Sequence, residues 1–248
     1  MMKTFTIALF LFVMSVVSVA QDAGEIIRKM EDRMRGDEVY MEVTMEIVRP
    51  RYTRSMSMKS WALGEDFSLI LVTAPARDRG IAYLKRDKEI WNWMPSIDRL
   101  IKLPPSMMSQ SWMGSDFTND DLVRESSTIT DYEHKLLGQE ETGGYMCYKI
   151  ELIPKPHAAV VWGKVLVWVS AEHYFQLRTE QYDERMELVN TIVFSDVKDL
   201  GGREIPVRME LTPHDKKGHK TVLIQESADF SPGLDASFFS IQNLQRVR

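Results

Sequence analysis

The stretch that decides the fold is residues 38–63, EVYMEVTMEIVRPRYTRSMSMKSWAL. Apolar and polar side chains alternate along its first half, and residues 52–61 alternate again after the break at Pro50. A period of two predicts half-buried β-strands. The stretch is therefore expected to form two strands, each with one methionine-rich apolar face. The apolar positions of the first strand are Val39, Met41, Val43, Met45 and Ile47, and Met56 and Met58 share one face of the second.

Working outward, residues 22–35 have helical spacing, with Ile26, Ile27, Met30 and Met34 on one stripe. Asp22 is expected to cap this helix and Gly36 to end it. Further strands are predicted at 66–73, 80–86, 88–94, 99–103, 128–137, 145–153, 162–170, 174–181, 186–196, 204–212 and 220–229. We expect residues 104–125 to form a loop with one or two short helices. Near the end of the chain, Asp235 is expected to cap a single turn before Phe238. The spacing favours one continuous antiparallel meander of about a dozen strands, without a linker between domains.

Residues 1–20 are expected to be a signal peptide cleaved after Ala20, which leaves one domain at 21–248. An apolar run from Phe5 to Val19 ends in small residues, Ser18 and Ala20. It is short for a membrane span of about 20 residues, so an uncleaved anchor is the weaker alternative. No cysteine follows the run to accept a lipid. The single cysteine, Cys147, excludes an intrachain disulfide, which for an exported chain is typical of a bacterial periplasm.

Composition and motifs argue against several function classes. The formal charge is -5 and no basic block occurs, so nucleic acid is a poor partner. The sequence has no G-x-S-x-G, H-E-x-x-H or C-x-x-C motif. His214 and His219 flank a short DKKG turn, but a structural zinc site needs about four ligands. Cys147 alternates within a strand and is expected to be a buried, inert thiol. We therefore expect no enzyme activity, no metal and no cofactor.

Methionine and tryptophan are the unusual residues, because 16 methionines and six tryptophans occur in the chain. Two interpretations stay open. In the first, these side chains fill a core, since methionine is a common gap filler. In the second, they line a concave apolar groove that binds acyl chains, with the helix and the central loop as its lid. A strand register that is wrong by one residue would exchange the lining set for its neighbours.

The stretch 77–122, RDRGIAYLKRDKEIWNWMPSIDRLIKLPPSMMSQSWMGSDFTNDDL, resembles the LolA-like superfamily, in the branch of outer membrane lipoprotein-sorting proteins. The matching motifs are R-x-x-G, W-x-aromatic-x-P, and a Met-rich run that leads into G-S-D-F-T-x-x-D. The resemblance extends more weakly over the whole mature chain. It implies an α+β fold, mainly β: a strongly curved antiparallel half-barrel of about 11–12 strands, with helices covering its open concave side.

The resemblance also implies a periplasmic carrier for lipids or for the acyl chains of lipoproteins. Its partners would be an inner-membrane transporter, often of RND type, and an outer-membrane acceptor, and the chain is expected to be a monomer. A non-carrier sensor, or an accessory subunit of such a transporter, is the alternative. The predicted apolar groove consists of Met41, Val43, Met45, Met56, Met58, Leu69, Leu71, Trp91, Trp93, Met107, Met108, Trp112 and Met113.

The remaining motif residues are expected to be structural. They are Arg77, Asp78, Gly80, Arg99, Gly114, Ser115, Asp116 and Asp120. Gly114 permits a tight turn, and Ser115 and Asp116 are expected to accept hydrogen bonds at the start of a short helix. Asp116 or Asp120 is expected to pair with Arg77 or Arg99.

Overall fold

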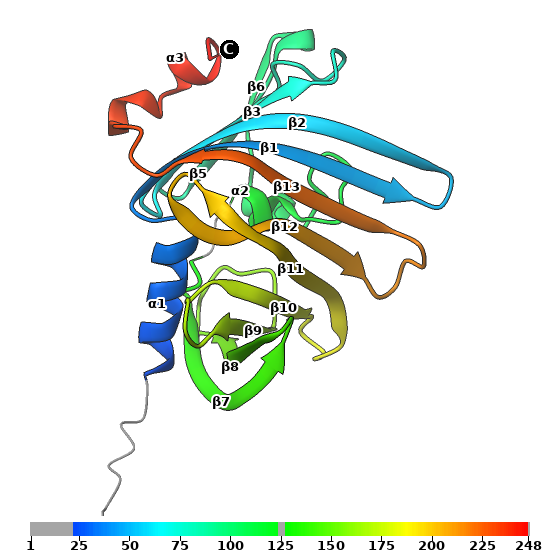
Figure 1. The fold of residues 1–248 in the computed structure, drawn as a ribbon. Coiled ribbons are helices and arrows are strands. Elements are labelled where there is room, and N and C mark those ends of the chain that lie inside the picture. Colours follow the sequence, from blue (N-terminus) through cyan, green and yellow to red (C-terminus); the bar gives the residue numbers. More distant parts are fainter. Residues whose placement is uncertain (1–21, 124–126, 248) are drawn as a thin grey trace, which may run out of the picture.

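A computed structural model describes residues 22–123 and 127–247, so the expected signal peptide lies outside the described residues. In this part of the chain thirteen antiparallel strands form one curved sheet that does not close (Figure 1). Their order is β6-β5-β4-β3-β2-β1-β13-β12-β11-β10-β9-β8-β7. The strands are β1 (Glu38–Arg49), β2 (Tyr52–Leu63), β3 (Phe67–Ala74), β4 (Ala82–Arg86), β5 (Glu89–Met94), β6 (Arg99–Lys102), β7 (Tyr132–Thr142), β8 (Tyr145–Pro154), β9 (Lys164–Ser170), β10 (Gln176–Tyr182), β11 (Leu188–Leu200), β12 (Arg203–Pro213) and β13 (Lys220–Asp229). The expected half-barrel is confirmed, with slightly more strands than the 11–12 predicted.

The strands form two meanders rather than the single one predicted. Strands β1 to β6 follow one another toward one edge, and β7 to β13 run back from the other edge. Pairing of β1 with β13, from Tyr40 opposite Asp229 to Val48 opposite Lys220, joins them at the centre. The positions of the strands agree with the prediction. The largest difference is at β7, which begins at Tyr132 and ends at Thr142.

The predicted N-terminal helix is α1 (Ala23–Met34). Asp22 caps it by accepting a hydrogen bond from the backbone N–H of Gly24 at 3.0 Å. Its apolar stripe, with Ile26, Ile27 and Met30, is buried against β7, β8 and β9. Three 3-10 turns also occur in the described residues, at Pro95–Ile97, Pro105–Met107 and Ala236–Phe238. None of the described helices is long and apolar enough to cross a membrane.

Residues 103–123 follow the edge strand β6 and enter the open side of the half-barrel, and we call them the central segment. This segment contains α2 (Asn119–Val123), which lies within the curve of the sheet (Figure 1). Its buried side chains Met108, Trp112 and Phe117 pack on the inner face of the sheet, against residues that include Met45 and Met58. This part of the concave face is therefore filled by the protein itself.

The outer face of β3, β4 and β5 is covered by the C-terminal segment, which includes α3 (Ile241–Leu244). Phe239 and Leu244 pack there against Leu69, Leu71 and Trp93. Strand β3 is apolar on both faces, because Ile70 and Val72 belong to the inner cluster at the same time. The sheet is thus buried on both sides at this edge.

Candidate functional site

Two adjoining cavities lie between α1, α2 and the inner face of the sheet in the described part of the chain. Their volumes are about 190 and 200 Å³. Both are lined by Met30, Leu122, Phe194 and Met209, so the two cavities share a wall. Taken together, they reach the low end of the roughly 300–1,000 Å³ range typical of small-molecule pockets. We call this space the inner cavity.

The apolar wall of the inner cavity differs between its two ends. At the end near β8 and β9 it consists mainly of branched side chains, such as Leu152, Val165 and Val167. At the end near β1 and β2 it is richer in methionine, with Met34 and Met41 beside the shared Met30. Methionine is flexible and polarizable, so this second end is able to adapt to apolar groups of varied shape.

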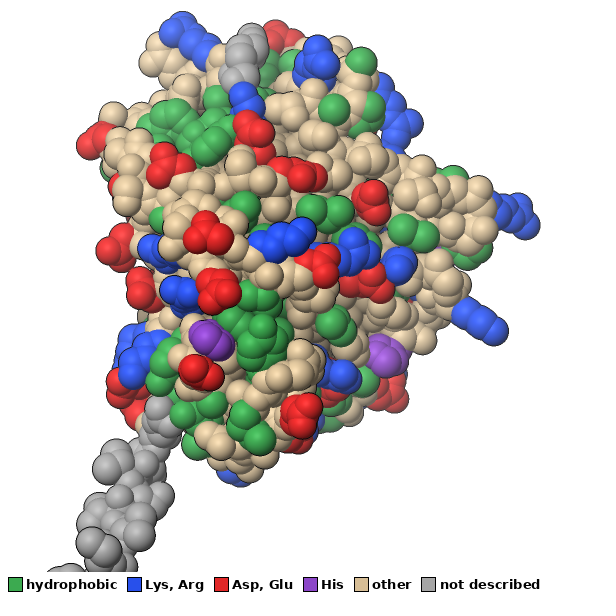
Figure 2. Space-filling model, in the orientation of Figure 1, with side chains coloured by type: hydrophobic (Ala, Val, Ile, Leu, Met, Phe, Trp, Pro, Cys, Tyr) green, Lys and Arg blue, Asp and Glu red, His purple; other side chains and the backbone are tan. Residues whose placement is uncertain are grey.

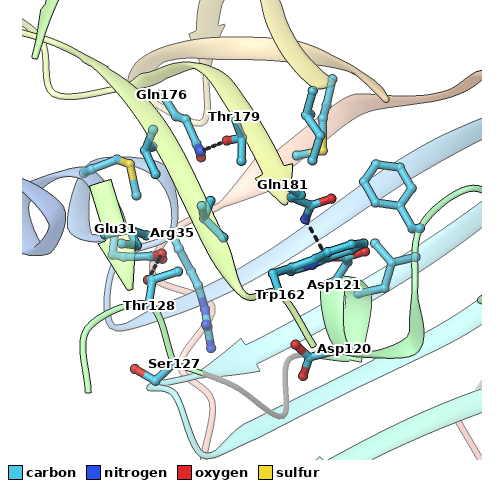
Figure 3. A pocket seen from close by; sticks show the side chains of 18 of the residues that line it. Glu31, Arg35, Asp120, Asp121, Ser127, Thr128, Trp162, Gln176, Thr179 and Gln181 are labelled. Atoms are coloured by element: carbon cyan, nitrogen blue, oxygen red, sulfur yellow. Dashed lines mark hydrogen bonds between the residues drawn. The ribbon is translucent and has the colours of Figure 1, made fainter. Parts of the chain in front are cut away.

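A hydrogen-bond network fixes α2 beside the cavity (Figure 3). The Oδ1 atom of Asp121 accepts from Trp162 Nε1 at 3.1 Å and from Gln181 Nε2 at 2.9 Å. Gln181 Oε1 in turn accepts from Asn190 Nδ2 at 2.9 Å. The other carboxylate oxygen of Asp121 accepts from the backbone and hydroxyl of Thr118, both at 2.8 Å. Because its members are bonded to one another, this buried polar network stabilises one arrangement of the wall.

Charged side chains of both signs line the side of the cavity near the end of α1. Glu31 accepts a hydrogen bond from the hydroxyl of Thr128 at 2.7 Å (Figure 3). Lys85, which is 7% exposed, donates to the backbone carbonyl of Glu65 at 2.6 Å. Asp120 is 4% exposed and also lines the cavity. Since apolar and polar walls meet here, the arrangement suits an amphiphile, with a chain inside and a polar group at this side.

Tyr132 closes the same region and stays neutral at ordinary pH. Burial is the main cause, and the carboxylates of Asp120, Asp121 and Asp131 add to it; together they raise the pKa of the phenol above its usual range. Burial alone raises the pKa of Tyr83, which packs beside Trp112 on the inner face, to about 12. Both rings are therefore neutral: Tyr132 lines the inner cavity, whereas Tyr83 belongs to the core beside it.

The structure separates the predicted groove residues into three groups. Met41 lines the inner cavity. The largest group lies in or against the core beneath the central segment, so these side chains fill a core rather than line a groove. They are Val43, Met45, Met56, Met58, Met108, Trp112 and Met113. Met107, which precedes Met108 in that segment, is partly buried, and its carbonyl accepts from Asn119 Nδ2 at 2.8 Å.

The third group requires a correction, because Leu69, Leu71, Trp91 and Trp93 lie on the outer face, under the C-terminal segment. Alternation could not show which residues of β3 face inward, because the residues on both faces of this strand are apolar. On β5, Asn92 is polar yet faces inward and is 7% exposed, with Nδ2 donating to the carbonyl of Ala82 at 3.2 Å.

The motif at 114–116 joins the central segment to the rim of the sheet. Asp116 pairs with Arg49 at 2.8 Å, rather than with Arg77 or Arg99, and its side chain is 2% exposed. Arg49 also donates to the carbonyl of Gly114 at 2.8 Å, and Asp116 accepts from Thr221 Oγ1 at 2.7 Å. The motif therefore connects the central segment to β1 and β13.

The caps of the short helix differ from the prediction. Ser115 Oγ accepts from the backbone of Phe117 at 3.2 Å, which supports the turn before the helix. The reciprocal cap of α2 is made by Thr118 and Asp121, because Thr118 Oγ1 accepts from the backbone N–H of Asp121 at 3.1 Å.

Three of the other motif residues, Arg77, Asp78 and Gly80, lie in the β3–β4 turn. Asp78 accepts from Arg54 at 2.7 Å and from Arg77 at 3.2 Å. Gly80 has a φ of +86°, and a Cβ there would lie 3.1 Å from Pro95 Cγ, so a larger residue is strained. Arg99 is exposed on the edge strand β6. These positions support the expected structural role of the turn.

Sequence reasoning missed most of the cavity wall. Thr179 and Gln181 alternate on β10 like solvent-facing residues, yet they point into the molecule and are each 6% exposed. Phe194 and Met209 lie on β11 and β12. Alternation in the sequence indicated the inner faces of these strands, but it did not distinguish core residues from cavity residues. Trp162, outside the strands, packs against the apolar cluster beneath α1 and donates a hydrogen bond to Asp121.

The described residues contain no group of three or more His, Cys, Asp and Glu side chains arranged to hold a metal ion. Cys147 lies in an apolar cluster away from the cavity and is fully buried. Burial raises the pKa of its thiol to about 11. The expected buried thiol is confirmed, and its low thiolate content makes it a poor nucleophile.

Comparisons with known proteins agree with this fold. A family model described as "Uncharacterized protein" matches residues 64–246. A putative outer membrane lipoprotein-sorting protein domain from Vibrio parahaemolyticus superposes with a TM-score of 0.80 at 24% identity, over 90% of this chain and 98% of that one. A DUF1329 family protein from Desulfovibrio piger gives 0.82 at 24% identity, over 91% and 100%. A LolA superfamily protein from Nitrosomonas europaea gives 0.77 at 24% identity, over 90% and 99%. The comparison with curated proteins gives no match.

Proposed function

The chain belongs to the family whose model matches residues 64–246, and from its LolA-like fold we propose that it is a periplasmic carrier that shields acyl chains. The cargo would be a free lipid or the acyl chains of a lipoprotein, moved toward the outer membrane. The protein acts by binding rather than by catalysis in this proposal.

The inner cavity is the observation that carries the proposal. An acyl chain in water costs about 0.8 kcal/mol per exposed CH₂ group, so transport across an aqueous compartment needs a covered apolar space. The cavity supplies apolar walls from β1, β8, β9, β11 and β12, and α1 and α2 cover it. The methionines at its β1 end suit reversible binding of chains that differ in shape.

The partners follow from the same proposal. A carrier that moves lipid outward receives it from an inner-membrane transporter, here of RND type, and delivers it to an outer-membrane acceptor. The description of the Vibrio parahaemolyticus structure as a putative outer membrane lipoprotein-sorting protein domain supports this direction of transport. Export by a signal peptide at residues 1–20 would place the protein in the periplasm.

The test fills the cavity. Met41→Trp and Met209→Trp place larger side chains at the β1 end and the shared wall, while Met146→Trp makes the same change at a residue that is 53% exposed. Native mass spectrometry and uptake of a fluorescent fatty acid report binding, and circular dichroism reports folding. We expect bound lipid in the parent and in Met146→Trp, and loss of binding in the two filled variants.

Two outcomes would contradict the proposal. One is a parent protein that, purified from membranes, repeatedly carries no lipid and takes up no fatty acid. The other is unchanged binding in both filled variants when circular dichroism shows that they are folded.

A further inference from the structure

Three turns adjoin one another at one end of the half-barrel, and the β1–β2 and β12–β13 hairpins among them project to the right in Figure 1. They are the β1–β2 turn, the β3–β4 turn and the β12–β13 turn. A Cβ on Gly218 would lie 3.4 Å from Pro50 Cγ, so the first and third turns touch. The ion pair between Arg54 and Asp78, at 2.7 Å, joins the first and second. We call this contiguous surface the three-turn end.

Exposed cations gather on the three-turn end, although the chain as a whole has a formal charge of -5. They are Arg51, Arg77, Arg79, Lys216 and Lys217. The nearby carboxylates of Asp78 and Asp116 are partly or fully buried and already paired with arginines. This leaves Asp215 as the exposed acid within these turns. Figure 2 shows Lys and Arg side chains at the tips of this end.

An exposed aromatic ring accompanies the cations. Tyr52 is 59% exposed, directly after Arg51 at the tip of the β1–β2 hairpin. Tyrosine next to lysine and arginine is typical of side chains that sit at a membrane–water interface. The cations stand on three separate tips, which fits a layer of headgroup phosphates that need no fixed geometry. The β10–β11 turn has a net negative charge, because Asp183, Glu184 and Glu187 outnumber Arg185, so the basic surface has a boundary there.

We propose that the three-turn end docks this protein on the anionic headgroups of a membrane surface. Docking requires only the surface of the turns, so it holds whatever the inner cavity binds. Each lysine or arginine near an anionic leaflet strengthens binding about fivefold, and three together by about a hundredfold. The attraction weakens as salt screens it.

The test is sedimentation with vesicles of phosphatidylcholine that contain roughly one-third phosphatidylglycerol, at about 0.02 and 0.15 M salt. The triple variant Arg51→Gln, Lys216→Gln, Lys217→Gln removes three cations from the three-turn end. The matched control Lys88→Gln, Lys135→Gln, Lys198→Gln removes three exposed lysines from other surfaces. We expect the first to lose about a hundredfold in vesicle partition and the second to stay within about threefold of the parent. Tyr52→Ala is expected to weaken binding as well, without changing its salt dependence.

Three outcomes would overturn the proposal. In the first, the parent does not sediment with the anionic vesicles. In the second, the two triple variants lose binding equally, which would show that binding depends on net charge rather than on the three-turn end. In the third, soluble polyglutamate binds the three-turn end more tightly than the vesicles do, which would identify an acidic protein as the partner instead. Fatty acid uptake by the cavity, measured on the same samples, keeps this result separate from the proposed carrier function.

Discussion

Asp116→Ala removes one partner of the most buried ion pair among those described, at the motif that connects the central segment to the sheet. The side chains of Arg49 and Asp116 are 9% and 2% exposed. Breaking a buried pair by deleting one partner costs about 3–5 kcal/mol, because the remaining charge stays buried. Arg49 keeps the carbonyls of Val48, Gly114 and Lys220 as acceptors, so the low end applies. We expect a loss of about 3 kcal/mol in unfolding free energy.

In a chain of this size each kcal/mol lowers the Tm by about 2–4 °C, so Asp116→Ala should melt about 6–12 °C below the parent in a circular dichroism or calorimetric scan. Asp215→Ala, at an exposed residue of a neighbouring turn, is the control and should stay within about 2 °C.

The double variant Arg49→Met, Asp116→Ala should recover most of the loss, since an apolar replacement of both partners leaves no charge buried. The reasoning fails if Asp116→Ala melts within 2 °C of the parent, or if the double variant is as unstable as the sum of the single ones.

Three further predictions follow from individual residues. Met45→Asp should prevent folding, because Met45 is fully buried in the core, whereas Met41→Asp should fold but bind less lipid; circular dichroism with a binding assay distinguishes them. Cys147, with a pKa raised to about 11, should not react with Ellman's reagent at pH 8 until urea unfolds the protein; rapid reaction of the folded protein would refute its burial. The hydrogen bond from Trp168, with a smaller contribution from Lys149, holds the pKa of Glu140 below its ordinary 4.5. A carboxyl group with a lowered pKa stabilises the fold above pH 4.5, and this stabilisation is lost as the pH falls below that value. Glu140→Gln should therefore make the unfolding free energy depend less on pH in the acid range, as followed by tryptophan fluorescence.

The sequence predicted local structure better than long-range pairing. The strands, α1 with its Asp22 cap, and the turn capped by Asp235 are each determined by neighbouring residues, and alternation is enough to find them. Pairing of β1 with β13 joins residues about 180 positions apart, and no local pattern indicates it. The two meanders therefore could not be predicted from periodicity alone.

The candidate site was predicted only in part, because burial on two faces hides the register. Leu69, Ile70, Leu71 and Val72 are all buried, so the sequence of β3 contains no polar side to define the inner face. On β10 the opposite happens: Thr179 and Gln181 are polar but face inward, where Gln181 donates to Asp121 and Thr179 accepts a hydrogen bond from Gln176. Polar residues at a cavity wall alternate in the sequence as they would on a solvated face, so the pattern alone does not distinguish the two cases.

The division of the concave face explains why methionine is abundant on both sides of it. Where the central segment packs, Met45, Met56 and Met58 fill gaps around the rings of Trp112 and Phe117, and the ion pair of Asp116 prevents that segment from leaving. Beyond α2 the described residues leave the inner cavity beside the sheet, and Met30, Met41 and Met209 line it. The same soft side chain therefore serves as core on one side of α2 and as an adaptable wall on the other. Because Asp121 attaches α2 to Trp162 and Gln181, a cargo that widens the cavity has to displace α1 or repack methionines before it disturbs the core.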